Sequence, residues 1–448
     1  MDWIKLLNDS RFGQTNQTTG TVNRTTFQRD FDRVVFSSSF RRLQSKTQVF
    51  PLPKDDFIHT RLTHSLETSC VGRSLGSIVG AEVVKRNPDY FAKADVTPDT
   101  FASIVASACL AHDIGNPPFG HSGEDAISSY FESDKAVPFI EGLTDLQVAD
   151  LQNFEGNALG FRILTHTLSA PHEVKGGLCL SCATLGAFTK YPKESLPILC
   201  EEANASEQKF GFFQSEKETF EKISEEMGLK KKSPDKGTAF HRHPLAFLVE
   251  AADDICYQIM DLEDGCKLKL VSFDKTFRLL MDVIDGDREK LLSVCDSLFD
   301  DREKIGFLRA KAINSLVTQC AGVFMENHDA ILDGSFDMHL VDCIRSRDAV
   351  QEVSRTAHSE IYCYRKVLEI EAAGFEVLGG LLQAFLSAVF CDTRRDRQIK
   401  TLIPKQYIND DIDRYDNIMN IIQFVSGMTD NFALDTFRAI KGITLPSY

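Results

Sequence analysis

The helical spacing of apolar residues is the feature that most constrains the fold of this 448-residue chain. Apolar side chains recur three or four residues apart in most segments, for example at Leu62, Leu66, Leu75 and Ile78, whereas alternation of single apolar and polar residues is scarce. A repeat of 3.6 residues per turn gathers such side chains on one face of a helix. The sequence therefore predicts a predominantly helical, all-α fold.

Composition and charge narrow the class of protein. Hydrophobic residues make up 43% and charged residues 26% of the chain, as in soluble globular proteins. The formal net charge of -15 disfavours broad binding to nucleic acid, which requires a basic surface. Residues 1–6 lack the basic start and long apolar run of a secretion signal, and most of the twelve cysteines stand singly in apolar segments. We therefore expect a cytoplasmic protein.

The length and the local composition suggest how the chain is organised. We expect one helical body over residues 1–448, with a core at about 30–270 that contains a polar insertion at about 200–240. Residues 271–448 should form a C-terminal helical region that packs on the core and provides an oligomer interface. The apolar run 372–391 has the length of a membrane span, but its Glu376 and paired glycines favour a helix buried in protein.

One predicted helix ends on residues that can bind metal and transfer protons. A threonine, a proline and an aspartate mark its start, and we expect it to run from Pro98 to Ile114, where Gly115–Pro118 ends it. This places the adjacent His112 and Asp113 in its last turn. An imidazole nitrogen and a carboxylate oxygen side by side can share one divalent cation.

A second predicted helix begins at His243-Pro244 and ends at Gly265. On it Asp253, Tyr257 and Asp261 lie at i, i+4 and i+8, so they form one polar stripe next to an apolar one. Such a stripe borders a core and could face a cavity, although the same spacing also occurs on ordinary surface helices.

The order of a single histidine, a His-Asp pair and a later aspartate resembles the HD-domain superfamily of metal-dependent phosphohydrolases. The local contexts resemble one branch in particular, the deoxynucleoside triphosphate triphosphohydrolases, or dGTPases. The matching stretches span most of the chain: 29–34, 41–49, 60–65, 112–124, 153–157, 190–192, 209–211, 250–257 and 374–382. The resemblance implies an HD-domain core with helical elaborations.

The resemblance also implies a metal site. Its ligands would be His64, His112, Asp113 and Asp253. A divalent cation held there would act as a Lewis acid on a phosphoryl oxygen. Nitrogen and carboxylate ligands suit Mn, Mg, Fe or Zn, so the sequence leaves the identity of the metal open.

The remaining site residues follow from the same resemblance. His121 and Glu124 would be catalytic, with Glu124 orienting an imidazole that either protonates the leaving 5'-oxygen or helps to activate water. The triphosphate and the base or sugar would be bound by the side chains of Arg61, Lys190, Tyr191 and Asn157. Gln48 and Asp261 would bind a 3'-hydroxyl, and Tyr257 would exclude a 2'-hydroxyl.

These observations predict an enzyme that hydrolyses deoxynucleoside triphosphates, dGTP or several dNTPs, to deoxynucleoside and inorganic triphosphate by attack of water at the α-phosphorus. The alternatives are an HD-domain phosphomonoesterase or phosphodiesterase that acts on other nucleotides, and a nucleotide-sensing regulatory HD protein. The resemblance further implies a homo-oligomer such as a hexamer, and an effector nucleotide or single-stranded DNA at a secondary site. We expect no membrane partner.

Overall fold

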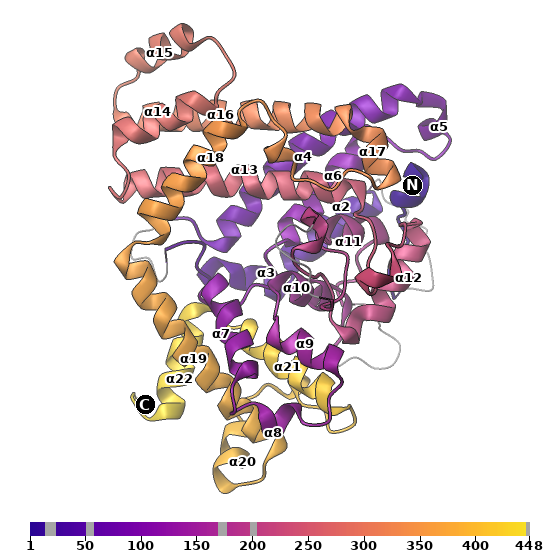
Figure 1. The fold of residues 1–448 in the computed structure, drawn as a ribbon, viewed down its shortest axis with the longest axis vertical. Helices are drawn as coiled ribbons and strands as arrows, with labels where there is room; N and C mark the ends of the chain where they lie inside the picture. Colours follow the sequence, from indigo (N-terminus) through magenta and orange to yellow (C-terminus); the bar gives the residue numbers. More distant parts are fainter. Residues whose placement is uncertain (14–23, 51–57, 169–176, 198–203, 445–448) are drawn as a thin grey trace.

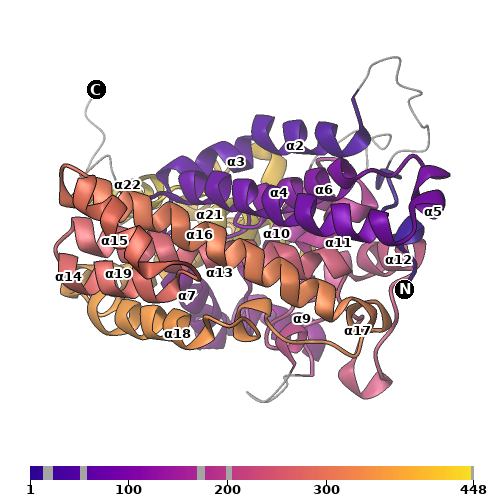
Figure 2. The same cartoon turned by 90° about the horizontal axis from the view of Figure 1, so that it is seen from above.

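Helices build almost all of the structure (Figures 1 and 2). The structure is a computed structural model that describes residues 1–13, 24–50, 58–168, 177–197 and 204–444. Within these residues, extended pairing is limited to isolated β-bridges. The predicted all-α fold is therefore confirmed.

The α-helices are α1 (Trp3–Leu6), α2 (Thr26–Phe36), α3 (Ser38–Arg42), α4 (Arg61–Arg86), α5 (Pro88–Ala92), α6 (Pro98–Ala111), α7 (His121–Glu132), α8 (Val137–Ile140), α9 (Asp145–Gln152), α10 (Gly156–Thr165), α11 (Cys182–Phe188), α12 (Lys217–Met227), α13 (Pro244–Lys267), α14 (Phe273–Val283), α15 (Arg288–Ser297), α16 (Asp301–Glu326), α17 (His328–Asp333), α18 (Arg347–Thr356), α19 (Arg365–Phe390), α20 (Arg394–Lys400), α21 (Arg414–Ser426) and α22 (Asp430–Lys441). Short 3-10 turns and one π-helical turn complete the set: η1 (Leu43–Ser45), η2 (Ala205–Glu207), η3 (Gln214–Glu216), η4 (Pro234–Lys236), η5 (Leu340–Asp342), η6 (Ala357–Tyr362, π) and η7 (Lys405–Tyr407).

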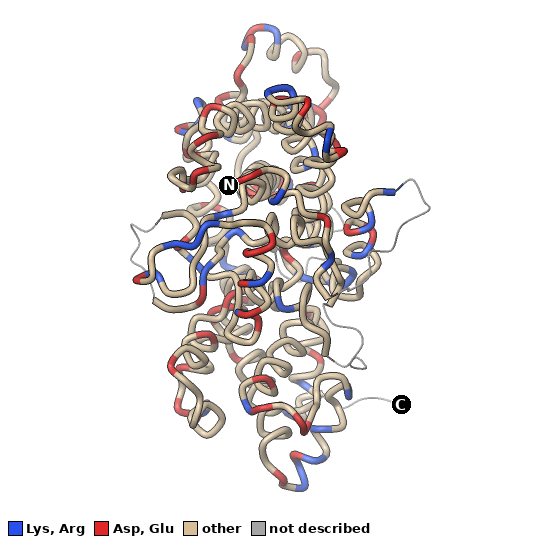
Figure 3. Tube along the Cα trace, turned by 90° about the vertical axis from the view of Figure 1, so that its right-hand side faces the viewer, with Lys and Arg blue, Asp and Glu red and all other residues tan. Residues whose placement is uncertain are grey.

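Two hydrophobic clusters hold these helices together. The first surrounds α4, α6, α13 and α16 in the upper part of Figure 1, and the second surrounds α7, α19 and α21 in the lower part. Residues after 271 contribute to both clusters, since α14, α16 and α18 belong to the first and α19 to α22 to the second. The expected division at about residue 270 stays a prediction. Figure 3 shows that basic and acidic residues are interspersed in both parts.

The helix pair α4 and α6 packs through small residues. A Cβ atom added to Gly76 would lie 2.9 Å from the Cα of Ala102, which is shorter than real contacts allow. Hydrogen at this position therefore lets the two backbones approach closely. The apolar spacing that predicted this helix gives only part of its buried face, because Leu75 is buried whereas Leu66 and Ile78 are exposed.

The end of α6 differs slightly from the prediction. The helix ends at Ala111 rather than Ile114, and the chain then tightens, with the amide of Ile114 donating to the carbonyl of Ala111. Gly115 follows at a contact where a Cβ would clash with the backbone of Gly160 in α10. His112 therefore lies just beyond the helix, in a turn that is held by the close contact between Gly115 and α10.

Helix α13 continues past its predicted end. Gly265 was expected to stop the helix, yet α13 runs to Lys267. Gly265 instead provides a contact surface, since a Cβ there would lie 2.5 Å from the side chain of Ile361 in η6. The residue serves packing rather than termination.

The apolar run near the C-terminus forms α19. This helix is long and apolar enough to cross a bilayer by length and composition, and it is the one helix of that kind among the described residues. Half of its most apolar window is buried inside the protein, where Leu378, Leu381 and Phe385 join the second cluster. The buried face of α19 therefore belongs to the core of the protein.

The polar segment expected as an insertion carries a buried aromatic face. Residues 198–203 lie outside the described part, but Phe212, Phe213 and Phe220 are all fully buried. Their rings contact one another or neighbouring rings, as in the stacked pair Phe212 and Phe220 with centroids 4.6 Å apart. This segment therefore contributes to the core although its composition is polar.

Glycine to alanine substitutions at two helical positions should have opposite effects on stability, because only one of the two glycines lies where α4 and α6 approach closely. Gly76→Ala should lower the free energy of unfolding by about 1–3 kcal/mol, because the new methyl group overpacks the interface. Gly322→Ala, in α16, meets no atom within 4 Å and should raise it by about 0.5–1 kcal/mol. Denaturant unfolding of both variants measures the difference, and equal effects at the two positions would refute the packing argument.

Candidate active site

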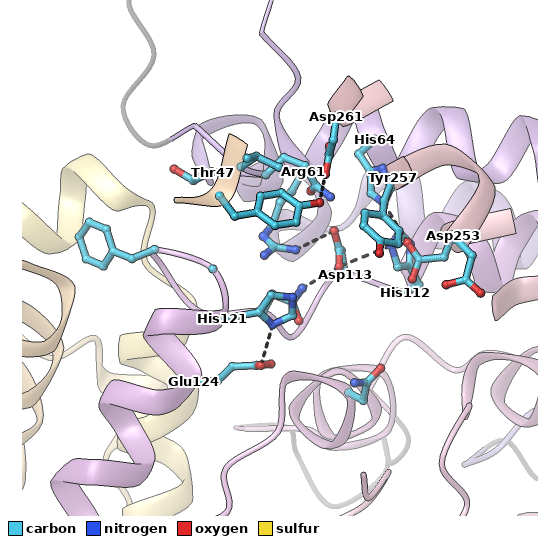
Figure 4. A pocket seen from close by; sticks show the side chains of 18 of the residues that line it. Thr47, Arg61, His64, His112, Asp113, His121, Glu124, Asp253, Tyr257 and Asp261 are labelled. Atoms are coloured by element: carbon cyan, nitrogen blue, oxygen red, sulfur yellow. Dashed lines mark hydrogen bonds and ion pairs between the residues drawn. The ribbon is translucent and has the colours of Figure 1, made fainter. Parts of the chain in front are cut away.

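A cavity of about 570 Å³ opens where α4, α7, α13 and the turn after α6 meet (Figure 4). Its size suits a nucleotide-sized ligand. The sequence-predicted site residues all line it: Gln48, Arg61, His64, His112, Asp113, His121, Glu124, Asn157, Lys190, Tyr191, Asp253, Tyr257 and Asp261. The structure thus brings them together, while their individual roles stay predictions.

Three of the predicted metal ligands form a compact group. The nearest ligand atoms of His64, His112 and Asp253 all lie within 4.8 Å of one another. Asp253 Oδ1 is 3.0 Å from His64 Nε2 and 3.3 Å from His112 Nε2. Helices α4 and α13 supply two of these side chains, and the turn after α6 supplies the third. The group is a candidate metal site.

The hydrogen bonds of His112 prepare it to bind a cation. Its Nδ1 lies 2.6 Å from the carbonyl oxygen of Cys109, which can only accept, so Nδ1 carries a proton and Nε2 is the nitrogen that a metal could bind. Nε2 is buried and has no hydrogen-bond partner. A carbonyl on the distal nitrogen is the usual support of a metal-binding imidazole. The residues present therefore fit a divalent metal.

Asp113 lies at the edge of this group. Its Oδ1 is 3.4 Å from His112 Nε2 and accepts a 2.6 Å bond from Asn116, while Oδ2 lies 2.9 Å from the guanidinium of Arg61. Burial alone would raise the pKa of Asp113, but Arg61 and His112 lower it to about 2. The carboxylate is thus ionised, as metal binding requires.

Lys190 forms an ion pair that the sequence did not indicate. Its ammonium group donates a 2.5 Å hydrogen bond to Asp253 Oδ2, and both groups line the cavity. Burial opposes ionisation of Asp253, but Lys190 and His112 hold the pKa of this carboxyl well below its ordinary value. Two predicted phosphate-binding cations, Lys190 and Arg61, therefore each contact a predicted metal ligand.

His121 and Glu124, the two residues predicted to be catalytic, lie in the first turn of α7. His121 Nδ1 lies 3.2 Å from Glu124 Oε2 (Figure 4). The other Glu124 oxygen accepts a 2.8 Å bond from the amide of Gly156. The bond to Glu124 raises the pKa of His121. The imidazole is 82% exposed at the mouth of the cavity, so it can meet a ligand.

The predicted sugar-binding residues also line the cavity. Gln48 Oε1 is buried without a hydrogen-bond partner, and Asp261 Oδ2 accepts a 2.7 Å bond from the hydroxyl of Tyr362. Burial raises the pKa of Asp261 to about 7 and that of Tyr257 to about 12. Tyr257 is therefore a neutral phenol beside a carboxyl group that is protonated in part at neutral pH.

Asn157 and Tyr191 also have protein contacts in this structure. The amide of Asn157 donates a 3.4 Å bond to Glu155, and the ring of Tyr191 lies 5.8 Å from the guanidinium carbon of Arg242. Burial raises the pKa of Tyr191 to about 12.

Sequence reasoning missed several residues of the lining. Lys209 stands in a stretch that resembles the family, which could have identified it, and its ammonium group lies 3.2 Å from Glu155 and 3.9 Å from Glu124. His358 and Tyr362 come from η6, more than 90 residues after the predicted site, where no pattern marked them. The other lining residues not predicted are Thr47, Val49, Asn116, Phe119, Gly120, Asp254, Val367 and Glu371.

The basic residues near the N-terminus do not form one anion site. Arg61 lines the cavity, whereas Arg41 is exposed and binds the carbonyl of Phe36. Arg42 donates to the carbonyl of Gly427, and Lys46 is buried on backbone carbonyls. A further basic residue of this segment, Lys54, lies outside the described residues.

Comparison with known proteins identifies the family. Residues 61–150 match the HD domain family. A deoxyguanosinetriphosphate triphosphohydrolase-like protein of Synechocystis is 43% identical, over 99% of this chain and 100% of its own length. This chain belongs to the deoxyguanosinetriphosphate triphosphohydrolase-like family. A second family member, from Pseudomonas aeruginosa, is 36% identical over 100% of both chains. A protein of Yersinia enterocolitica named deoxyguanosinetriphosphate triphosphohydrolase is 30% identical, over 92% of this chain and 93% of its own. The resemblance noted in the sequence is thereby confirmed.

The His64, His112 and Asp253 group predicts a metal-binding defect that can be measured without substrate. His112→Ala should weaken Mn²⁺ binding by more than about 100-fold, since the loss of a supporting outer contact alone costs about 10- to 100-fold. Isothermal titration measures the affinity, and circular dichroism checks the fold.

His166→Ala is the matched control, because His166 lies at the end of α10 and does not line this cavity. Its Mn²⁺ affinity should equal that of the unaltered protein. Equal binding by both variants would remove His112 from the ligand set.

Proposed function

We propose that this protein hydrolyses deoxynucleoside triphosphates to deoxynucleoside and inorganic triphosphate. The observation that carries the proposal is the convergence of His64, His112 and Asp253 beside an acid–base pair in a cavity of nucleotide size. The names of the relatives, which refer to deoxyguanosine triphosphate, support the same substrate class.

The metal and the cations of the site have complementary tasks. His64, His112 and Asp253, together with the predicted ligand Asp113, would hold a divalent metal, and when bound it supplies Lewis acidity at the α-phosphate. The ligand types present do not select one metal among Mn, Mg, Fe and Zn. Phosphoryl transfer depends mainly on positioning and charge neutralisation, which we assign to the cationic lining residues Arg61, Lys190 and Lys209.

The leaving group needs a proton. When the oxygen of water attacks the α-phosphorus, the bond from phosphorus to the 5'-oxygen breaks and this oxygen becomes an alkoxide unless it is protonated. We assign the donor role to His121, since Glu124 raises its pKa and holds the ring by Nδ1, leaving Nε2 for the ligand.

Selection for deoxyribose is assigned to the neighbouring side chains. The unpartnered Gln48 Oε1 and the Asp261 carboxyl group are available to a 3'-hydroxyl. The bulk of Tyr257 would meet a 2'-hydroxyl, and a ribonucleotide would lose hydration at that group without gaining a partner.

We also propose that copies of the protein assemble with one another, and where the protein is located. Exposed Leu368 and Phe375 on the N-terminal half of α19 support contacts between copies through the C-terminal region, in a homo-oligomer such as a hexamer. An effector nucleotide or single-stranded DNA at a secondary site, and a cytoplasmic location, are proposed from the family resemblance alone.

Product identification tests the proposed reaction. With Mn²⁺ or Mg²⁺, dNTPs should yield deoxynucleoside and intact triphosphate in equal amounts, while the corresponding NTPs should react far more slowly. The panel should include all four dNTPs, with and without a second dNTP as effector, and be resolved by ion-exchange chromatography. Release of orthophosphate or pyrophosphate would instead support a phosphomonoesterase or phosphodiesterase, and nucleotide binding without turnover would support a regulatory protein.

The pair of His121 and Glu124 predicts a shift in pH dependence. A proton donor works below its pKa, so kcat should fall as pH rises through the pKa of His121. Glu124→Gln keeps an acceptor for the amide of Gly156 but removes the charge that raises this pKa. The alkaline limb of the kcat profile should therefore move to lower pH.

Glu132→Gln, on the exposed side of the same helix, controls for a general effect of removing one carboxylate from α7. Its profile should match that of the unaltered enzyme. An alkaline limb that stays in place in Glu124→Gln would show that another group donates the proton.

A further inference from the structure

Asp430 connects the C-terminal part of the chain to two loops of the active site. It is the first residue of α22 and is 2% exposed. Its Oδ2 accepts hydrogen bonds from the amide of Thr47, at 2.9 Å, and from the Thr47 hydroxyl, and its Oδ1 accepts the amide of Phe119 at 3.1 Å. One buried carboxylate thus joins segments that are 383 and 311 residues away from it in the sequence.

Lys46 forms a second connection between the same three segments. Its ammonium group is buried and donates to the carbonyl of Asn116, at 2.5 Å, and to the carbonyl of Ser426, at 2.7 Å. We refer to residues 46–47, 116–119 and 426–430 together as the latch.

Both loops held by the latch lead directly into the site. Thr47 is followed by Gln48, and Phe119 is followed by Gly120 and His121. Phe119 and Gly120 both have positive φ, 65° and 66°, so the turn before α7 is one that a phenylalanine adopts only when its surroundings hold it. The bond from the Phe119 amide to Asp430 is part of that support.

The carboxylate of Asp430 is not needed to cap its own helix. The hydroxyl of Thr429 caps α22 by accepting the amide of Phe432 at 3.3 Å. All the hydrogen bonds described for the Asp430 side chain go to Thr47 and Phe119. The hydrogen bonds of this side chain therefore connect separate segments rather than cap α22.

We propose that Asp430 is a positioning residue for the reaction: it sets the distance between the loop of Gln48, at the sugar, and the turn that carries His121, at the leaving oxygen. This inference rests on the proposed dNTP hydrolysis. It also implies that the reaction rate depends on the position of α22, because a movement of α22 would release both loops at once.

Steady-state kinetics with dGTP separates the two arms of the latch. Asp430→Asn replaces one acceptor oxygen with a donor, so an N–H group would face another N–H, and kcat should fall by about 10- to 100-fold through misplacement of His121. Thr47→Val removes one hydroxyl and disturbs the Gln48 arm alone, so KM should rise about fivefold with kcat nearly unchanged. Asp435→Asn, which removes an exposed carboxylate from α22 and no latch contact, should leave both constants unchanged.

Hydrogen exchange tests the latch without any turnover. Peptides that contain the amides of Thr47 and Phe119 should exchange faster in Asp430→Asn than in the unaltered protein, and not in Asp435→Asn. Unchanged exchange would refute the latch, and faster exchange with an unchanged kcat would refute the positioning role. If Asp430→Asn does not fold, Thr47→Val decides, since an unchanged KM refutes the proposal. If the unaltered protein releases no triphosphate from any dNTP, the proposed function fails, while the exchange data still report on the latch.

Discussion

The close packing of α4 against α6 is the constraint on which the rest of the site depends. Glycine at position 76 lets the two backbones approach, so His64 on α4 and His112 after α6 come to one place. Helix α13, in the same hydrophobic cluster, adds Asp253. Ligands from three elements can form one site only if these elements are held rigidly, and a dense apolar core with few voids provides that rigidity.

Charge compensation is the second principle of the site. Arg61 faces Asp113 and Lys190 faces Asp253, so buried carboxylates that would otherwise take up protons stay ionised. Under the proposed function the same cations lie beside the bound triphosphate. Because these cations also contact the predicted ligands, a bound metal, the carboxylates and the phosphates would interact electrostatically, and each group would influence the affinity for the others.

Much of this arrangement could be predicted from the sequence, for identifiable reasons. Apolar spacing predicted the helices, and the family resemblance selected side chains that all line one cavity. The helix ends were predicted less well, because Gly265 packs against Ile361 instead of ending α13, which depends on a contact between distant segments. The same limit explains why Tyr362 and Asp430 were missed. Their contacts with Asp261 and Thr47 arise from tertiary packing over more than 100 residues of sequence, and no local pattern encodes them.

The central claim is that His64, His112 and Asp253 hold one divalent cation beside Asp113. Anomalous diffraction from crystals grown with Mn²⁺, recorded at the manganese absorption edge, tests it most directly. We expect a single strong peak about 2 Å from the two Nε2 atoms and from an oxygen of Asp253. A cavity without such a peak at saturating Mn²⁺, or a peak coordinated by other residues, would contradict the account.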